Sequence, residues 1–324
     1  MMEDQLRHDF ERARHKAVLH DLLAALNRQT NDLLPFHEIR SRLSPSGESY
    51  RGLQTVPIQQ IIGSMDRFED FDRTFLPRRK NTRGRWTNVD RAFYEDIRLP
   101  PIQLYKFGDI YFVKDGNHRV SVARERGVEF IDAEVIEGHI RVPLSSTMSP
   151  TELLMQAEYA EFLRQTDLDR LEPDHDLRPT ALGRYDVVWI HIEAHRAWLT
   201  SIWDREATVH EAVNDWYTYV YMPIVQVVRD RGVLDEFPDL TEADIYLWVM
   251  YHRATLEARD GHDVGPVESA EDYAELMTQP LNAGERMLEF LGVDSPRSPD
   301  AEREVKRRRG RLRRWPRPRR SGPS

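Results

Sequence analysis

Residues 99–137 restrict the fold of this chain more than any other stretch. Their apolar runs are interrupted by two tight turns, Gly108-Asp109 and Asp115-Gly116. The first turn joins two short strand-like runs, which is typical of a β-hairpin. The second turn leads into a helix that starts at Asn117 and is followed by an alternating strand, 129–138. This order predicts a small mixed sheet packed against a helix.

Helical patterns surround this unit on both sides. An amphipathic helix is expected over residues 4–28, and another is expected to start at Thr87. Beyond residue 149 the patterns are mainly helical, with helix-start signals at 149–152, 208–211 and 241–244. We therefore predict the α+β class, with an all-α region after the sheet. The predicted divisions are an N-terminal helical segment (1–48), the sheet-containing domain (49–145), a helical domain (149–295) and a disordered basic tail (296–324).

The charge is divided unevenly along the chain. The net charge is −9, yet residues 303–324 contain eleven basic residues and one glutamate, so the first 302 residues carry −19. A basic tail on an acidic body indicates an anionic partner for the tail, such as nucleic acid, the ribosome or anionic lipid. The expected nucleic-acid contacts are Arg307, Arg308, Arg309, Arg311, Arg313 and Arg314. The acidic body itself would repel phosphates.

Two absences limit the chemistry. The chain contains no cysteine, which removes disulfides, thiolate metal sites and cysteine nucleophiles, and fits a cytoplasmic location. No stretch approaches the roughly 20 apolar residues of a membrane span, and the N-terminus has no apolar signal region. We therefore expect a cytoplasmic protein without a membrane span.

The turn at Gly116 contains the parts of a phosphate site. Glycine lets the chain pass from strand to helix within one residue, and the first amides of the helix are free donors at the positive end of its dipole. Arg119 and His118 add donors, and Asp115 is a candidate ligand for a divalent cation. The alternative is an ordinary turn, because Asp-Gly is a common turn pair and Asn a common helix cap.

The surrounding residues resemble the ParB/sulfiredoxin superfamily. The resemblance covers about residues 52–138 and rests on the order of its motifs: a Pro-Arg loop at Pro77-Arg78-Arg79, a strand opened by Pro101-Ile102, a hairpin, and the turn Gly116-Asn117-His118-Arg119. Nearly the whole chain except the tail also resembles an uncharacterised bacterial family that adds a helical domain of unknown function. These resemblances imply a ParB-like sheet domain with an all-α extension.

Three activities are known among proteins of this kind. Sulfiredoxins need a cysteine where this chain has Asn117, which excludes their chemistry. ParB proteins bind and hydrolyse CTP while clamping DNA, but this chain has His118 where they have an arginine. ParB-like free-serine kinases carry Asp-Gly-x-His-Arg, which matches Asp115 to Arg119. Their catalytic glutamate lies in an upstream loop, and its counterpart is not evident among Glu69, Asp70 and Asp72.

The resemblance implies binding of ATP or CTP with Mg²⁺. Gly116, Asn117, His118 and Arg119 would hold the phosphates together with Arg78 and Arg79, while Asp115 would serve as the catalytic and Mg²⁺-binding carboxylate. Phosphoryl transfer or nucleotide hydrolysis is the reaction class that such a site would perform. The alternative is a non-catalytic, ParB-like, DNA-associated regulator that uses the basic tail and is a possible homodimer.

A second group of polar residues, in "HIEAHR", is a candidate metal site. His191 and His195 are four residues apart and share a helix face, but Glu193 does not occupy the position of the zinc-protease motif. A third ligand is not evident in the sequence. We therefore favour surface or interface histidines over a metal site.

Overall fold

The computed structural model describes residues 1–26, 31–66 and 69–278. They form two compact units, Met1–Trp216 and a second that begins at Tyr217, each described by itself. The predicted helical domain, 149–295, spans the boundary between them. The chain is an α+β protein, as the sequence predicts: one small mixed sheet lies in the first unit, and the described part of the second is helical.

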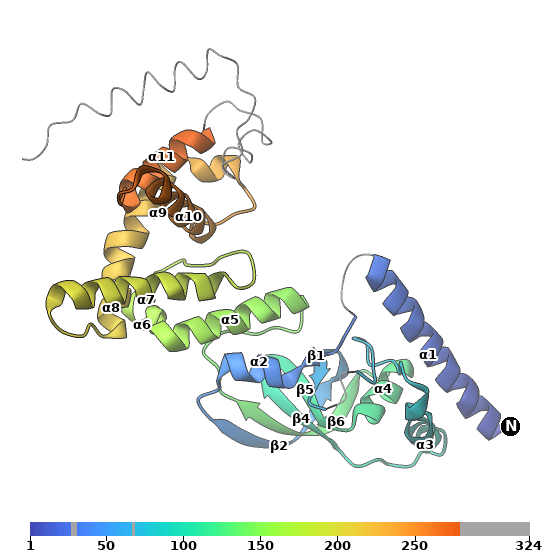
Figure 1. The fold of residues 1–324 in the computed structure, drawn as a ribbon. Coiled ribbons are helices and arrows are strands. Elements are labelled where there is room, and N and C mark those ends of the chain that lie inside the picture. Colours follow the sequence, from blue (N-terminus) through green and yellow to red (C-terminus); the bar gives the residue numbers. More distant parts are fainter. Residues whose placement is uncertain (27–30, 67–68, 279–324) are drawn as a thin grey trace, which may run out of the picture. The chain divides into compact units, whose positions relative to one another are not determined.

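The elements follow one another in this order (Figure 1). The first unit contains α1 (Met2–Leu26), β1 (Leu34–Pro35), α2 (Phe36–Leu43), β2 (Glu48–Pro57), β3 (Ile61–Ser64), α3 (Arg83–Tyr94), β4 (Ile102–Phe107), β5 (Ile110–Asp115), α4 (Asn117–Glu125), β6 (Phe130–Gly138), α5 (Pro150–Thr166), α6 (Leu168–Leu171), α7 (Arg184–Trp203) and α8 (Val209–Trp216). The second contains a π-helix (Tyr217–Tyr221), α9 (Met222–Asp230), α10 (Glu242–Asp260) and α11 (Pro266–Thr278).

The sheet has the strand order β1-β3-β5-β4-β6-β2. The expected hairpin is its centre, since β4 and β5 are antiparallel and join through Phe107 and Ile110. β1, β3 and β5 run parallel to one another, and β6 is parallel to β4 and antiparallel to β2. Because β3 and β5 are parallel, they end at the same edge of the sheet.

Both faces of the central strands are covered, which explains why β5 reads as a continuous apolar run. Side chains alternate between the faces of a strand. Val113 therefore packs in the core cluster that contains Val120 of α4, whereas Phe112 lies on the other face against Phe36 of α2, with ring centroids 5.5 Å apart. A strand buried on both sides loses the polar alternation of a half-exposed strand.

Helix α1 packs through about its first two-thirds, up to Ala17. Leu6, Phe10, Ala13 and Ala17 recur at intervals of three or four residues and are completely buried. Phe10, Ala13 and Ala17 belong to a cluster with Trp86 of α3 and Val122 of α4. The helix expected over 4–28 is thus confirmed in its described part, and residues 27 and 28 lie outside the described residues.

The start of α3 differs from the sequence prediction. The helix begins at Arg83, one turn before Thr87, and continues directly from a 3-10 turn at Lys80–Thr82. Thr87 does not cap the helix, because its hydroxyl donates back to the carbonyls of Arg83 and Gly84 from inside the helix. Trp86, which is fully buried, fixes this first turn against the core.

The three helix-start signals are confirmed. Ser149 and Glu152 form a reciprocal capping box at the start of α5. Thr241 and Asp244 form another at the start of α10. At α8 the backbone N–H of Glu211 donates to Thr208, and the backbone N–H of Thr208 donates to the Glu211 carboxylate. No helix among the described residues is long and apolar enough to span a bilayer.

Candidate functional site

The turn between β5 and α4 depends on glycine. Gly116 has φ = +110°, in the left-handed region, and precedes the first residue of α4. A Cβ atom built there would lie 2.4 Å from Cγ2 of Ile102, so no other side chain fits without displacing β4. The backbone N–H of Val120 donates to the carbonyl of Gly116. The amides of residues 117–119 precede that bond and therefore have no partner within the helix.

A sequence-distant loop meets this turn. β3 and β5 end at the same edge of the sheet, where the N–H of Met65 donates to the carbonyl of Val113. The loop that follows β3 brings the ring of Phe71 into edge contact with His118, with centroids 5.3 Å apart. The start of α4 and the loop that carries the predicted Pro-Arg motif thus meet at the edge of the sheet where the parallel strands end.

Arg119 is held within the turn. One terminal nitrogen donates to the carbonyls of Pro100 and Pro101, at 2.5 and 2.9 Å, and the other donates to Asp115 at 2.5 Å. Its side chain is 14% exposed, whereas that of Asp115 is 70% exposed. These contacts tie the start of β4 to the start of α4, so Arg119 positions the turn. Its predicted phosphate contact stays a prediction.

The two arginines of the Pro-Arg loop have different surroundings. Arg78 donates to Asp21 at 2.6 Å and to Asp32 at 2.5 Å. Burial acts to lower the pKa of Arg78, but its bonds to Asp32 and Asp21 raise the pKa overall, so the cation is firmly paired. Arg79 pairs with Glu69 at 2.5 Å and is 52% exposed. Arg79 is therefore the arginine of this loop that is accessible to a ligand.

Asn117 and Asp115 complete the turn. Asn117 is buried, and its side-chain oxygen has no hydrogen-bond partner in the described chain. Asp115 is the first residue of the motif, exposed and paired with Arg119. The described residues contain no group of three or more His, Asp or Glu side chains placed to hold a metal. A single carboxylate fits Mg²⁺ only where phosphates supply further oxygen ligands.

The "HIEAHR" residues are engaged in local contacts. The ring of His195 hydrogen-bonds to Asp215 at 2.7 Å, and Arg196 pairs with Glu193 at 2.8 Å. The His195–Asp215 bond joins α7 to α8, whereas the Arg196–Glu193 pair lies within α7.

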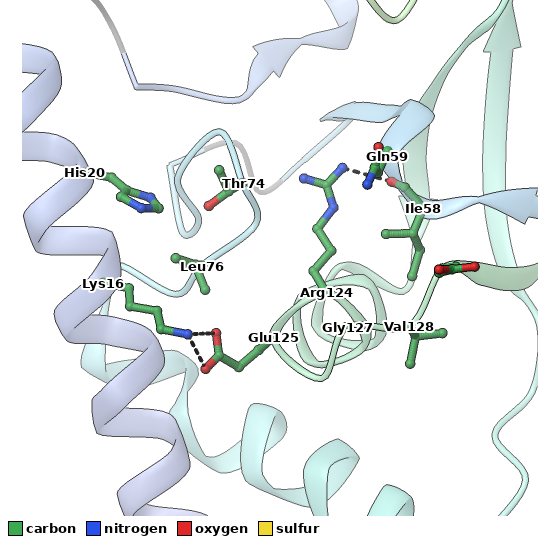
Figure 2. Close-up of a pocket in the computed structure, with 11 residues that line it drawn as sticks. Lys16, His20, Ile58, Gln59, Thr74, Leu76, Arg124, Glu125, Gly127 and Val128 are labelled. Carbon is green, nitrogen blue, oxygen red and sulfur yellow. Dashed lines mark hydrogen bonds and ion pairs between the residues drawn. The ribbon is translucent and has the colours of Figure 1, made fainter.

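A separate cleft lies at the opposite end of α4 and was not predicted (Figure 2). Its volume is about 660 Å³, and its walls come from α1, the loop after β3, the 3-10 turn Ile58–Gln60 and the end of α4. Arg124, the penultimate residue of α4, projects into it. No sequence motif marks this cleft, because its walls are assembled from four segments far apart in the chain.

Comparisons with known proteins give little further information. No protein-family model matches the chain, and no curated protein matches its sequence. A solved structure of a Pnob8-like ParB-N domain is 13% identical, with a TM-score of 0.20, over 72% of this chain and 99% of that one. A structural similarity at that TM-score supports no conclusion about this chain.

Proposed function

We propose that this protein binds a nucleotide, ATP or CTP, with the phosphates at the amino end of α4. The observation that carries the proposal is the meeting of three features at one sheet edge: the left-handed glycine turn, the first amides of α4, and the loop with Arg79. Edges of this kind, at the carboxyl ends of parallel strands, are the usual ligand sites of α/β sheets. The Asp-Gly-x-His-Arg pattern supports the same assignment.

Each residue of the proposed site would have its own role in phosphate binding. The amides of residues 117–119 would donate to the phosphate oxygens, and Gly116 permits the close approach of the backbone. Arg79 would leave Glu69 to pair with the phosphates, and His118 would add a donor. Arg119 and Arg78 would hold the turn and the loop in place.

Asp115 is proposed to hold Mg²⁺ carried by the nucleotide, since its carboxylate is exposed beside the phosphate position. A bound Mg²⁺ would neutralise charge on the phosphates. If the site turns over, phosphoryl transfer or nucleotide hydrolysis is the reaction class, because the turn offers positioning and charge and has no nucleophile of its own.

The second proposed function is nucleic-acid binding through the tail. It rests on the composition of residues 303–324, eleven basic residues against one acidic, and on Arg307 to Arg314 in particular. These residues lie outside the described part of the chain, so this function stays a prediction from sequence.

Replacing Arg79 by alanine is expected to weaken nucleotide affinity by about tenfold, because a charge-assisted contact to phosphate is lost. The matched control is Arg83→Ala, since Arg83 is also exposed and lies four residues away. Calorimetric titration with ATP and CTP in the presence of Mg²⁺ measures the effect. A chain that ends at residue 302 should bind nucleotide like the full chain. Equal affinities for Arg79→Ala and Arg83→Ala would contradict the proposed site.

A further inference from the structure

The cleft at the carboxyl end of α4 is bordered by a cation whose charge is not paired. Arg78, Arg119 and Arg126 of the same unit all pair with aspartates. Arg124 pairs with none: within the described residues its hydrogen bonds go only to two backbone carbonyls, those of Ile58 and Ile61, at 2.9 and 2.6 Å.

Those two bonds use a single terminal nitrogen of the guanidinium group. The Nε atom is buried and has no partner in the described structure. Figure 2 shows the second terminal nitrogen turned away from Ile58, toward the side of the cleft on which Thr74 lies. The second terminal nitrogen of Arg124, and not the buried Nε, is therefore the donor that remains for a group that enters the cleft.

The loop after β3 is built to hold this cation. Phe75 is completely buried and has φ = +63°, a conformation that is costly for an aromatic residue. Its ring lies under the guanidinium carbon of Arg124, 5.0 Å from the ring centroid. Oδ1 of Asp72 accepts bonds from the backbone N–H groups of Thr74 and Leu76, which fixes the turn around Phe75.

Of the acidic groups nearby, Asp72 and Glu125 are engaged with α1, whereas Glu129 is an exposed lining residue that makes no ion pair with Arg124. Asp72 favours the cationic form of Arg124, but its second oxygen is bonded to His20 of α1 at 3.0 Å. Glu125 is bonded to Lys16 of α1 at 2.8 and 2.9 Å. Burial lowers the pKa of Arg124 to about 10, which still leaves the guanidinium charged at neutral pH.

The position at the end of a helix does not exclude an anion. Carbonyls of a helix carboxyl end repel negative charge when they are free. Here the N–H groups of Arg126, Gly127 and Val128 bond to the carbonyls of residues 122, 124 and 123. A volume of about 660 Å³ lies within the range of small-molecule sites.

We propose that this cleft binds a small ligand through an oxyanion, a carboxylate or phosphate group, that pairs with Arg124. The ligand would supply the counter-ion that the described chain lacks, and it would contact α1, the Phe75 loop and α4 together. This site is distinct from the phosphate position at the amino end of α4 and does not depend on it.

Gln59→Glu tests the proposal without removing Arg124, which holds two carbonyls and is therefore unsuitable for truncation. Gln59 is exposed and lines the cleft beside Arg124 (Figure 2), so a glutamate there supplies an internal counter-ion. Gln60→Glu is the matched control, with the same charge change one residue further along and outside the cleft lining. The control also corrects for the general stabilisation that phosphate salts give.

The melting temperature of the full chain is measured with inorganic phosphate and, separately, with acetate, against chloride at equal ionic strength. We expect a saturable rise of a few degrees with at least one of the two anions for wild type and Gln60→Glu, and none for Gln59→Glu. The anion that acts identifies the ligand group.

The proposal is overturned if neither anion raises the melting temperature of the wild type, or if Gln59→Glu responds like Gln60→Glu. A response lost in Arg79→Ala and kept in Gln59→Glu would assign the anion to the α4 amino end and also overturn it.

Discussion

Trp86→Ala is expected to lower the free energy of unfolding by about 3–5 kcal/mol, the cost of removing a large aromatic side chain from a packed core. Trp86 is completely buried, packs edge-on against Phe10 of α1 at 5.7 Å, and donates from Nε1 to the hydroxyl of Ser121 at 2.9 Å. Its removal leaves a cavity between α1, α3 and α4 and an unpaired hydroxyl. Urea unfolding followed by circular dichroism measures the loss.

Trp198→Ala is the control for this experiment. Trp198 lies on α7 with 54% of its surface exposed, so its loss should change the unfolding free energy by no more than about 1 kcal/mol. Equal effects of the two substitutions would show that α1 does not pack on α3 in solution as it does in this structure.

Gly116→Ala is expected to lower the free energy of unfolding by about 2–5 kcal/mol, from two sources. The left-handed backbone costs about 1–2 kcal/mol for a residue with a Cβ atom. The overlap of that atom with Ile102 adds the cost of overpacking, about 1–3 kcal/mol. Thermal or urea unfolding measures the sum, and nucleotide binding should weaken with it because the turn is displaced.

A control substitution at Gly127 separates the backbone cost from the cost of overpacking. It also has a positive φ, +70°, but a Cβ atom built there meets nothing within 4 Å. Gly127→Ala should therefore cost only the backbone part, about 1–2 kcal/mol. If both alanine variants lose the same stability, the close approach of Gly116 to Ile102 is not what requires glycine.

The sequence predicts the centre of the fold because local patterns determine it. The hairpin turn at Gly108-Asp109, the start of α4 after Gly116 and the capping box at Ser149 each depend on residues within a few positions of one another. The start of α3 at Arg83 was missed because packing of Trp86, not a cap, determines it.

The hydrogen-bond and ion-pair partners of the site residues could not be predicted from the sequence. Arg78 bonds to Asp21 and Asp32, which precede it by 57 and 46 residues, and Arg119 bonds to backbone carbonyls that no side-chain pattern reveals. The same holds for the cleft around Arg124, whose lack of an ion pair within the described residues appears only once the tertiary fold is known. Residue types indicated a phosphate site, whereas the fold distinguishes exposed Arg79 from paired Arg78.

Hydrogen exchange of the full chain, with and without saturating ATP or CTP and Mg²⁺, tests the nucleotide site most directly. In the proposed complex, bound phosphates would contact the first amides of α4 and order the loop that faces it. We predict slower exchange for peptides that cover residues 112–120 and 69–79, and unchanged exchange at Gln59 and the end of α4. Unchanged exchange at residues 112–120 with either nucleotide at saturation would contradict this prediction.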